Sequence, residues 1–151
     1  MRRWIPWSCL LFSLTVRADD GACDLGESDD PLEVARLVQR CGEVAVRRDL
    51  DPKASIADRY GALVAVRYLE APESVLPSLV SYAVGRDPDL AEAAAQSLEA
   101  VVTHHAVGAL DRGVDAHAEW GELEEALDHG LSDTTIRPDI RTMLRRVRGY
   151  L

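Results

Sequence analysis

The sequence lacks the short motifs that mark common catalytic sites. It contains no HExxH zinc-protease motif, no GxSxG nucleophile elbow and no glycine-rich phosphate-binding loop. Its histidines are His104, His105, His117 and His129. Neighbouring residues on a helix point about 100° apart, so His104 and His105 are badly placed to share one metal ion. The sequence therefore predicts no catalytic site, no metal site and no bound cofactor.

Positive charge is scarce as well. The 151 residues include 17 Lys and Arg against 26 Asp and Glu, which gives a formal net charge of −9. A chain this acidic is poorly suited to binding the phosphate backbone of a nucleic acid. The simplest role of the charge is to keep the protein in solution, and we expect no nucleic-acid partner.

No membrane span is expected either. The apolar stretch near the start, residues 5–16, is interrupted by polar residues and is shorter than the roughly 20 residues that a spanning helix needs. It follows two arginines and precedes a small-residue cleavage site, Val16-Arg17-Ala18. Residues 1–18 are therefore predicted to be an export signal, with a buried first helix as the alternative. Cleavage would leave 133 residues, enough for one domain, and would lower the formal charge from −9 to −12.

Cysteine is rare, and its positions suggest the compartment. Cys9 lies in the predicted signal, which leaves Cys23 and Cys41 as an even pair. In an oxidising compartment such a pair usually forms a disulfide, and closing this loop should stabilise the fold by roughly 3 kcal/mol. The alternative is that Gly21-Ala22-Cys23 ends a lipoprotein signal and that Cys23 is lipidated, although Asp20 stands where that pattern has an aliphatic residue. The predicted location is periplasmic or secreted.

What the chain does contain is helical periodicity, with no competing strand pattern. The clearest example is residues 88–102, where Asp87 is a good N-cap, Pro88 suits the first turn, and a mostly alanine face is opposite Glu92 and Gln96. The fold class is therefore all-α with roughly six helices. The predicted helix starts are Pro31, Ser55, Pro72, Pro88, Asp115 and Pro138.

Several glycines and prolines should shape these helices. Gly42 is expected to interrupt the first helix, and Pro77 to kink the third or delay its start. Gly130 is expected to cap the end of the helix predicted over 115–129. The helix predicted over 55–70 is apolar almost all round, which predicts that it is buried between neighbours.

Residues 50–103 resemble HEAT-type helical repeats. Asp-Pro pairs at 51–52 and 87–88 each precede an apolar helix, and residues 62–71 match 91–100 at five positions. The resemblance implies a short right-handed α-solenoid of helical hairpins over residues 31–151, after an acidic lead-in at 19–30. Such a fold would be a non-catalytic protein-binding or scaffold module.

The same resemblance suggests where a protein partner would bind. The second helix of each HEAT hairpin usually lines the concave side, so the predicted partner-contacting residues are Ser74, Ser78, Ser81, Tyr82 and Arg86. The alternatives are a lyase-type enzyme, because some HEAT-like families include pigment lyases, and an envelope component anchored by lipid at Cys23. A pocket gathered around the histidines would favour the enzyme, whereas a groove with exposed Tyr82 would favour binding.

The end of the chain reverses the charge balance. Residues 131–151 hold five arginines and two acids, whereas residues 19–130 hold 24 acids and nine basic residues. Four of the arginines fall along one side of the last predicted helix: Arg137, Arg141, Arg145 and Arg148. This basic strip either seats the last helix against the acidic helix before it or offers a surface to an anionic partner, such as a lipid headgroup or an acidic protein. The first reading is favoured because a short link makes the two helices antiparallel neighbours.

Overall fold

The computed structural model describes residues 23–26, 28, 30–112 and 120–151. In these residues the secondary structure consists of α-helices and one 3₁₀ turn, with no strand, which confirms the all-α class. The predicted export signal and most of the acidic lead-in lie outside the described residues. No described helix is both long enough and apolar enough to cross a membrane.

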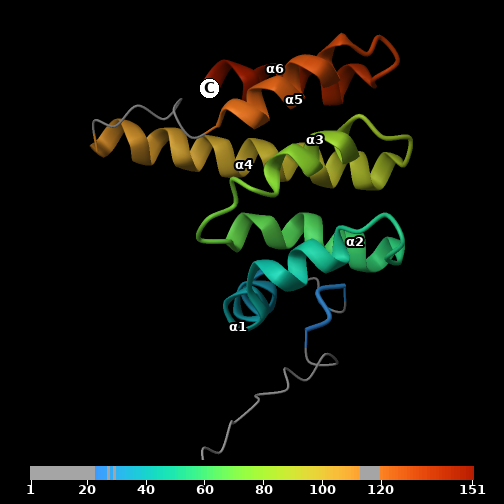
Figure 1. Ribbon diagram of the computed structural model, residues 1–151, viewed down its shortest axis with the longest axis vertical. Helices are drawn as coiled ribbons and strands as arrows, with labels where there is room; N and C mark the ends of the chain where they lie inside the picture. Colours follow the sequence, from blue (N-terminus) through green and yellow to red (C-terminus); the bar gives the residue numbers. More distant parts are fainter. Residues whose placement is uncertain (1–22, 27, 29, 113–119) are drawn as a thin grey trace, which may run out of the picture.

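The helices pack in consecutive pairs. They are α1 (Pro31–Asp49), α2 (Ile56–Ala65), α3 (Leu76–Ala83), α4 (Pro88–Arg112), α5 (Gly121–Ser132) and α6 (Pro138–Tyr150), with the 3₁₀ turn η2 (Val66–Tyr68) after α2. Helix α1 packs on α2, α3 on α4, and α5 on α6, and the three pairs lie one above another (Figure 1). Helix α4 also contacts α2 and α6, and α3 contacts α5. Helix α4 is therefore the centre of the fold.

The first helix begins and breaks as its sequence predicts. The Asp30 carboxylate accepts a hydrogen bond from the Leu32 amide at 2.9 Å, and Pro31 occupies the first turn. Gly42 has φ 69° and ψ −170°, a left-handed backbone conformation that favours glycine. The expected interruption at Gly42 is thus confirmed, and α1 consists of two helical segments joined there.

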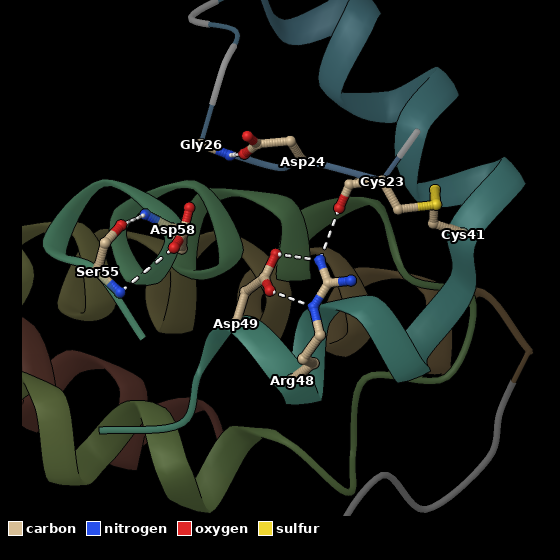
Figure 2. Close-up of polar contacts among 8 residues, drawn as sticks. All are labelled: Cys23, Asp24, Gly26, Cys41, Arg48, Asp49, Ser55 and Asp58. Atoms are coloured by element: carbon tan, nitrogen blue, oxygen red, sulfur yellow. Dashed lines mark hydrogen bonds and ion pairs between the residues drawn. A yellow bond between two sulfur atoms is a disulfide. The ribbon is translucent and has the colours of Figure 1, made fainter. Parts of the chain in front are cut away.

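The second helix begins at the predicted residue, Ser55, but the Asp51-Pro52 signal before it has another role. Asp51 and Pro52 do not open it; the Asp51 carboxylate accepts from the Lys53 amide at 2.8 Å and closes a turn. Helix α2 is capped by Ser55, whose hydroxyl accepts from the Asp58 amide, while the Asp58 carboxylate accepts from the Ser55 amide (Figure 2). One of the two Asp-Pro signals behind the repeat resemblance is therefore a turn.

The segment after α2 is also less helical than expected. Helix α2 ends at Ala65 rather than Glu70, and the chain becomes extended at Leu69 after η2. Helix α3 starts at Leu76 because Pro77 takes its first turn, so Pro77 marks a late start rather than a kink. The match between residues 62–71 and 91–100 therefore does not extend to equivalent secondary structure.

Helix α4 is buried on more sides than a surface helix. Leu98 has no exposed area, and Ala93, Ala95 and Ser97 are buried outside the predicted apolar face. The small alanine side chains let α2, α3 and α6 approach this helix together. Between 90 and 100 the exposed residues are Glu92, Gln96 and Ala100.

Gly130 does not cap α5, contrary to the expectation. It lies inside the helix, which continues to Ser132, and it is buried against α3. A β-carbon at Gly130 would lie 3.1 Å from Val80 Cγ1 and 3.2 Å from Val84 Cγ1, so the missing side chain allows α5 to pack closely on α3. The described part of this helix begins at Gly121, and residues 115–119 of the predicted helix lie outside the described residues.

The segment before α1 is fastened to the first helical pair (Figure 2). The sulfur atoms of Cys23 and Cys41 lie 2.03 Å apart in a disulfide. Arg48 donates to the Cys23 carbonyl oxygen at 2.7 Å and also pairs with the buried Asp49 carboxylate at 2.6 Å. Leu25 has no exposed area and packs in the core. We call residues 23–26 the N-terminal strap.

Candidate partner-binding surface

The residues predicted to contact a partner lie on and beside α3. Ser78, Ser81 and Arg86 are exposed. Ser74 is exposed too, and its hydroxyl donates to Glu43 at 2.6 Å, which holds the pKa of Glu43 below its ordinary value. Tyr82 is half-buried, and its hydroxyl donates to the Leu50 carbonyl at 2.6 Å. The exposed Tyr82 that would mark a binding groove is therefore not found.

The observed pairs of helices differ from the pairs that the resemblance implied, so other helices are the second of their pair. The resemblance made the helix predicted from Pro72 the second of a pair with the helix predicted over 55–70, but the structure pairs α3 with the following helix, α4. The second helices are thus α2, α4 and α6, and they contact one another in series. The role of the α3 residues stays a prediction that the geometry does not test.

Exposed apolar side chains gather on the second helices. Among the described residues, the large apolar side chains with high exposure are Leu32, Val44, Ile56, Tyr60, Val107 and Tyr150. Ile56 and Tyr60 on α2 are 58% and 44% exposed, Val107 on α4 is 55% exposed, and Tyr150 on α6 is 46% exposed. The prediction that the residues of α2 are buried all round is wrong at Ile56 and Tyr60, because none of the described helices covers that side.

These four side chains line two grooves along α4. One groove, of about 700 Å³, lies between α2 and the first half of α4 and is lined by Ile56 and Tyr60. The other is a shallow, open depression of about 720 Å³ that lies beside the second half of α4 and is lined by Val107 and Tyr150. Gln96 lines both, so the grooves meet at the middle of α4. We call the joined surface the α4 groove.

The charge of the α4 groove is uneven. At its α2 end the lining includes the carboxylates of Asp89 and Glu92 and no basic side chain. Glu92 accepts a hydrogen bond from Gln96 at 3.1 Å, and neither acid forms an ion pair with a described residue. At the other end Glu99 is paired with Arg146 at 2.8 Å. The negative charge that lacks a counter-ion is therefore concentrated beside Ile56 and Tyr60.

The basic strip is largely occupied by contacts within the chain. Arg148 donates to Asp128 of α5 at 2.9 Å, and this hydrogen bond holds the pKa of Asp128 below its ordinary value. Arg141 donates to the Asp133 carbonyl oxygen at 2.5 Å, at the end of α5. These contacts support the reading in which the arginines seat the last helix.

The other two members of the strip, Arg137 and Arg145, differ in their contacts. Arg137 pairs with Asp139 at 2.6 Å and donates to the Pro88 carbonyl oxygen at 3.3 Å, which links α6 to the start of α4. Arg145 is exposed and has no ion pair or hydrogen bond from its side chain to a described residue. Arg145 is therefore the member most available to a partner.

Comparing Arg148→Gln with Arg145→Gln should show whether the basic strip holds α6 against α5 or binds a partner. Arg148→Gln removes the contact with α5, and the unfolding midpoint should fall by less than about 4 °C, with a smaller fall at high salt. Arg145→Gln should leave the midpoint unchanged, and both variants should still capture a partner. Thermal melts at two salt concentrations and a capture assay measure these effects. Lost capture by Arg145→Gln with an unchanged midpoint would instead make the strip a recognition surface.

Two of the histidines line a further cavity of about 490 Å³, which shares Ala100 and His104 with the lining of the α4 groove. His104 and His105 lie there together with Glu70, Glu73 and Arg67, which are residue types used in acid–base chemistry. No hydrogen bond joins either histidine side chain to another described side chain. No group of three or more metal-binding side chains occurs in the described residues. A pocket beside the histidines is therefore present, and it keeps the enzyme as the alternative.

Of the other two histidines, only His129 belongs to the described residues, and it does not line this cavity. His105 also packs on Trp120, with ring centroids 4.5 Å apart, so it helps fix the start of α5. His129 is exposed near the end of α5. His117 lies outside the described residues. The three described histidines thus do not converge on one centre.

Sequence reasoning did not find the α4 groove. Ile56 and Tyr60 were assigned to a buried helix, and Val107 and Tyr150 lie beyond the stretches whose faces were predicted. The one sequence signal was the polar side of residues 88–102, because Glu92 and Gln96 do line the groove.

Comparisons with protein-family models, curated proteins and solved structures find no match for this chain.

Proposed function

We propose that this chain is a non-catalytic protein-binding module, built as a short HEAT-like α-solenoid, that holds its partner along the α4 groove. The stacked helical pairs support the solenoid, because each second helix contacts the second helix of the next pair. One observation carries the binding site: Ile56, Tyr60, Val107 and Tyr150, four of the six highly exposed large apolar side chains among the described residues, line this one surface. Contiguous exposed apolar surface commonly marks an interaction site.

The dimensions of the groove suit a segment of another protein. Between Asp89 and Val107 the helix α4 advances about 27 Å at its usual rise per residue. An extended chain of about eight residues or a helix of about five turns covers that length. The groove is thus long enough to select a partner by several side chains.

The disulfide supports a site of action outside the cytoplasm. Disulfides persist in oxidising compartments, and the Cys23–Cys41 bond joins the N-terminal strap to α1. This bond supports the proposal that the chain is exported and acts in the periplasm or as a secreted protein. A sulfur in a disulfide cannot also form the thioether of a lipid anchor, so the structure favours the exported module over the form lipidated at Cys23.

Affinity capture from the native host with paired groove variants tests the proposal. Tyr60→Ser combined with Val107→Ser removes one apolar contact from each half of the groove, and we expect at least a tenfold loss of captured partner, since buried apolar anchors carry most interface energy. Both side chains are exposed, so the free energy of unfolding should change by less than about 1 kcal/mol.

The control uses the two exposed apolar residues that lie elsewhere. Leu32→Ser combined with Val44→Ser changes α1, away from the groove, and should leave capture intact. A third variant, Ser78→Arg combined with Ser81→Arg, tests the surface predicted on α3. Equal capture by wild type and the groove variant would refute the groove, and loss only in the α3 variant would move the site to α3.

A further inference from the structure

We infer that the segment bound in the α4 groove is basic as well as apolar, with a lysine or arginine seated between Asp89 and Glu92 while apolar side chains cover Ile56 and Tyr60. This inference rests on the proposed function and names the chemistry of its partner. It commits to a basic amphipathic segment of another protein rather than to a lipid surface or a second copy of the chain.

The arrangement at the α2 end of the groove carries the inference. Ile56 and Tyr60 expose more than two fifths of their surface there, and the carboxylates of Asp89 and Glu92 line the same groove. The lining contains no lysine, arginine or histidine, and neither acid forms an ion pair with a described residue. A partner that covered Ile56 without bringing a cation would leave two carboxylates partly desolvated and unpaired, which is costly. A basic side chain would offset that cost.

At the other end of the α4 groove, the acidic side chain already has a counter-ion. There Glu99 already has Arg146 as a counter-ion at 2.8 Å, so a partner needs no cation beside it. Val107 and Tyr150 offer apolar contacts at that end. The preferred segment therefore carries its positive charge toward α2, and this asymmetry would fix the direction in which the segment lies.

Other occupants fit this charge pattern less well. A membrane with anionic lipids would be repelled by Asp89, by Glu92 and by the net charge of −9. A second copy of the chain would bring the same net charge of −9, so the two copies would repel each other overall.

A pair of synthetic peptides tests the inference on the full chain. Both are 18-residue amphipathic helices with one leucine face; the polar face is lysine in one peptide and glutamate in the other. Fluorescence anisotropy of the labelled peptides should show binding of the lysine peptide only, with an affinity that weakens as salt is raised. Asp89→Asn combined with Glu92→Gln should weaken binding of the lysine peptide by about tenfold at low salt.

The matched control removes two acids elsewhere. Glu122→Gln combined with Glu125→Gln changes the net charge by the same amount on the exposed side of α5 and should alter the affinity by less than about twofold. An equal loss in both double variants would mean attraction by overall charge and would overturn the inference. Binding of the glutamate peptide as tight as that of the lysine peptide would overturn it as well.

Two further results separate this inference from the proposed function. If the lysine peptide fails to bind while Tyr60→Ser with Val107→Ser still abolishes partner capture, the groove binds a partner that is not basic. If the lysine peptide binds wild type but the same groove variant binds it equally well, the cationic segment docks elsewhere and the inference is wrong. Dimerisation that Asp89→Asn with Glu92→Gln abolishes, measured by sedimentation, would identify a second copy as the occupant.

Discussion

The Gly61→Ala variant should unfold with a free energy about 3 kcal/mol lower than that of wild type, because the N-terminal strap passes directly over this glycine. A β-carbon at position 61 would overlap the Leu25 carbonyl group and would lie 2.7 Å from the Gly26 amide nitrogen. These are backbone atoms, so no side-chain rotation can make room. Either α2 must shift or the strap must lift and withdraw Leu25, which has no exposed area, from the core.

A double-mutant cycle identifies which of these occurs. With Cys23→Ser and Cys41→Ser in the background, the strap can lift more freely, so Gly61→Ala should cost less than in wild type. Gly149→Ala is the matched control, because nothing lies within 4 Å of a β-carbon there, and alanine should be neutral or slightly stabilising in α6. Urea melts of all these variants give the free energies. A cost of Gly61→Ala below about 1 kcal/mol in both backgrounds would mean that the strap does not lie where the structure places it.

Local signals in the sequence predicted several helix boundaries correctly. Asp30 and Asp87 cap α1 and α4, and Pro138 opens α6, because a cap and the first turn involve only residues close in sequence. The break at Gly42 is local for the same reason. Ser55 caps α2 at the predicted start, whereas Asp51, which precedes it, closes a turn and caps no helix, because its side chain can do either.

The errors concern features that depend on which helices meet. From the local sequence alone, Gly130 is typical of a helix end. In the structure it lies inside α5, where the missing side chain allows close packing on Val80 and Val84. The pairing of α3 with α4 rather than with α2 decides which helices are second in their hairpins, and the sequence carries no signal for that choice. The α4 groove follows from this pairing, so neither its position nor the exposure of Tyr60 could be read from periodicity.

The central position of α4 leads to the second large effect. Leu98→Ala should lower the free energy of unfolding by about 2–5 kcal/mol, because it removes a fully buried side chain and leaves a cavity that neighbouring helices cannot fill. Helix α4 is held by α2, α3 and α6 at once, so a collapse around Leu98 would disturb several contacts. Urea denaturation monitored by circular dichroism at 222 nm is the measurement, and the expected cost lies at the upper end of that range if the three helices keep their positions.

Gln96→Ala is the control on the same helix, two residues away. Gln96 is exposed and its amide donates to Glu92 at 3.1 Å, so its loss should change the free energy of unfolding by less than about 0.5 kcal/mol. A larger cost for Gln96→Ala than for Leu98→Ala would mean that α4 is rotated, with its groove side facing inward.

Because Gln96 lies where the two halves of the α4 groove meet, Gln96→Arg should weaken partner capture while leaving stability intact. Leu98→Ala should lower stability first and affect capture only as the fold is lost, which separates the core side of α4 from its binding side.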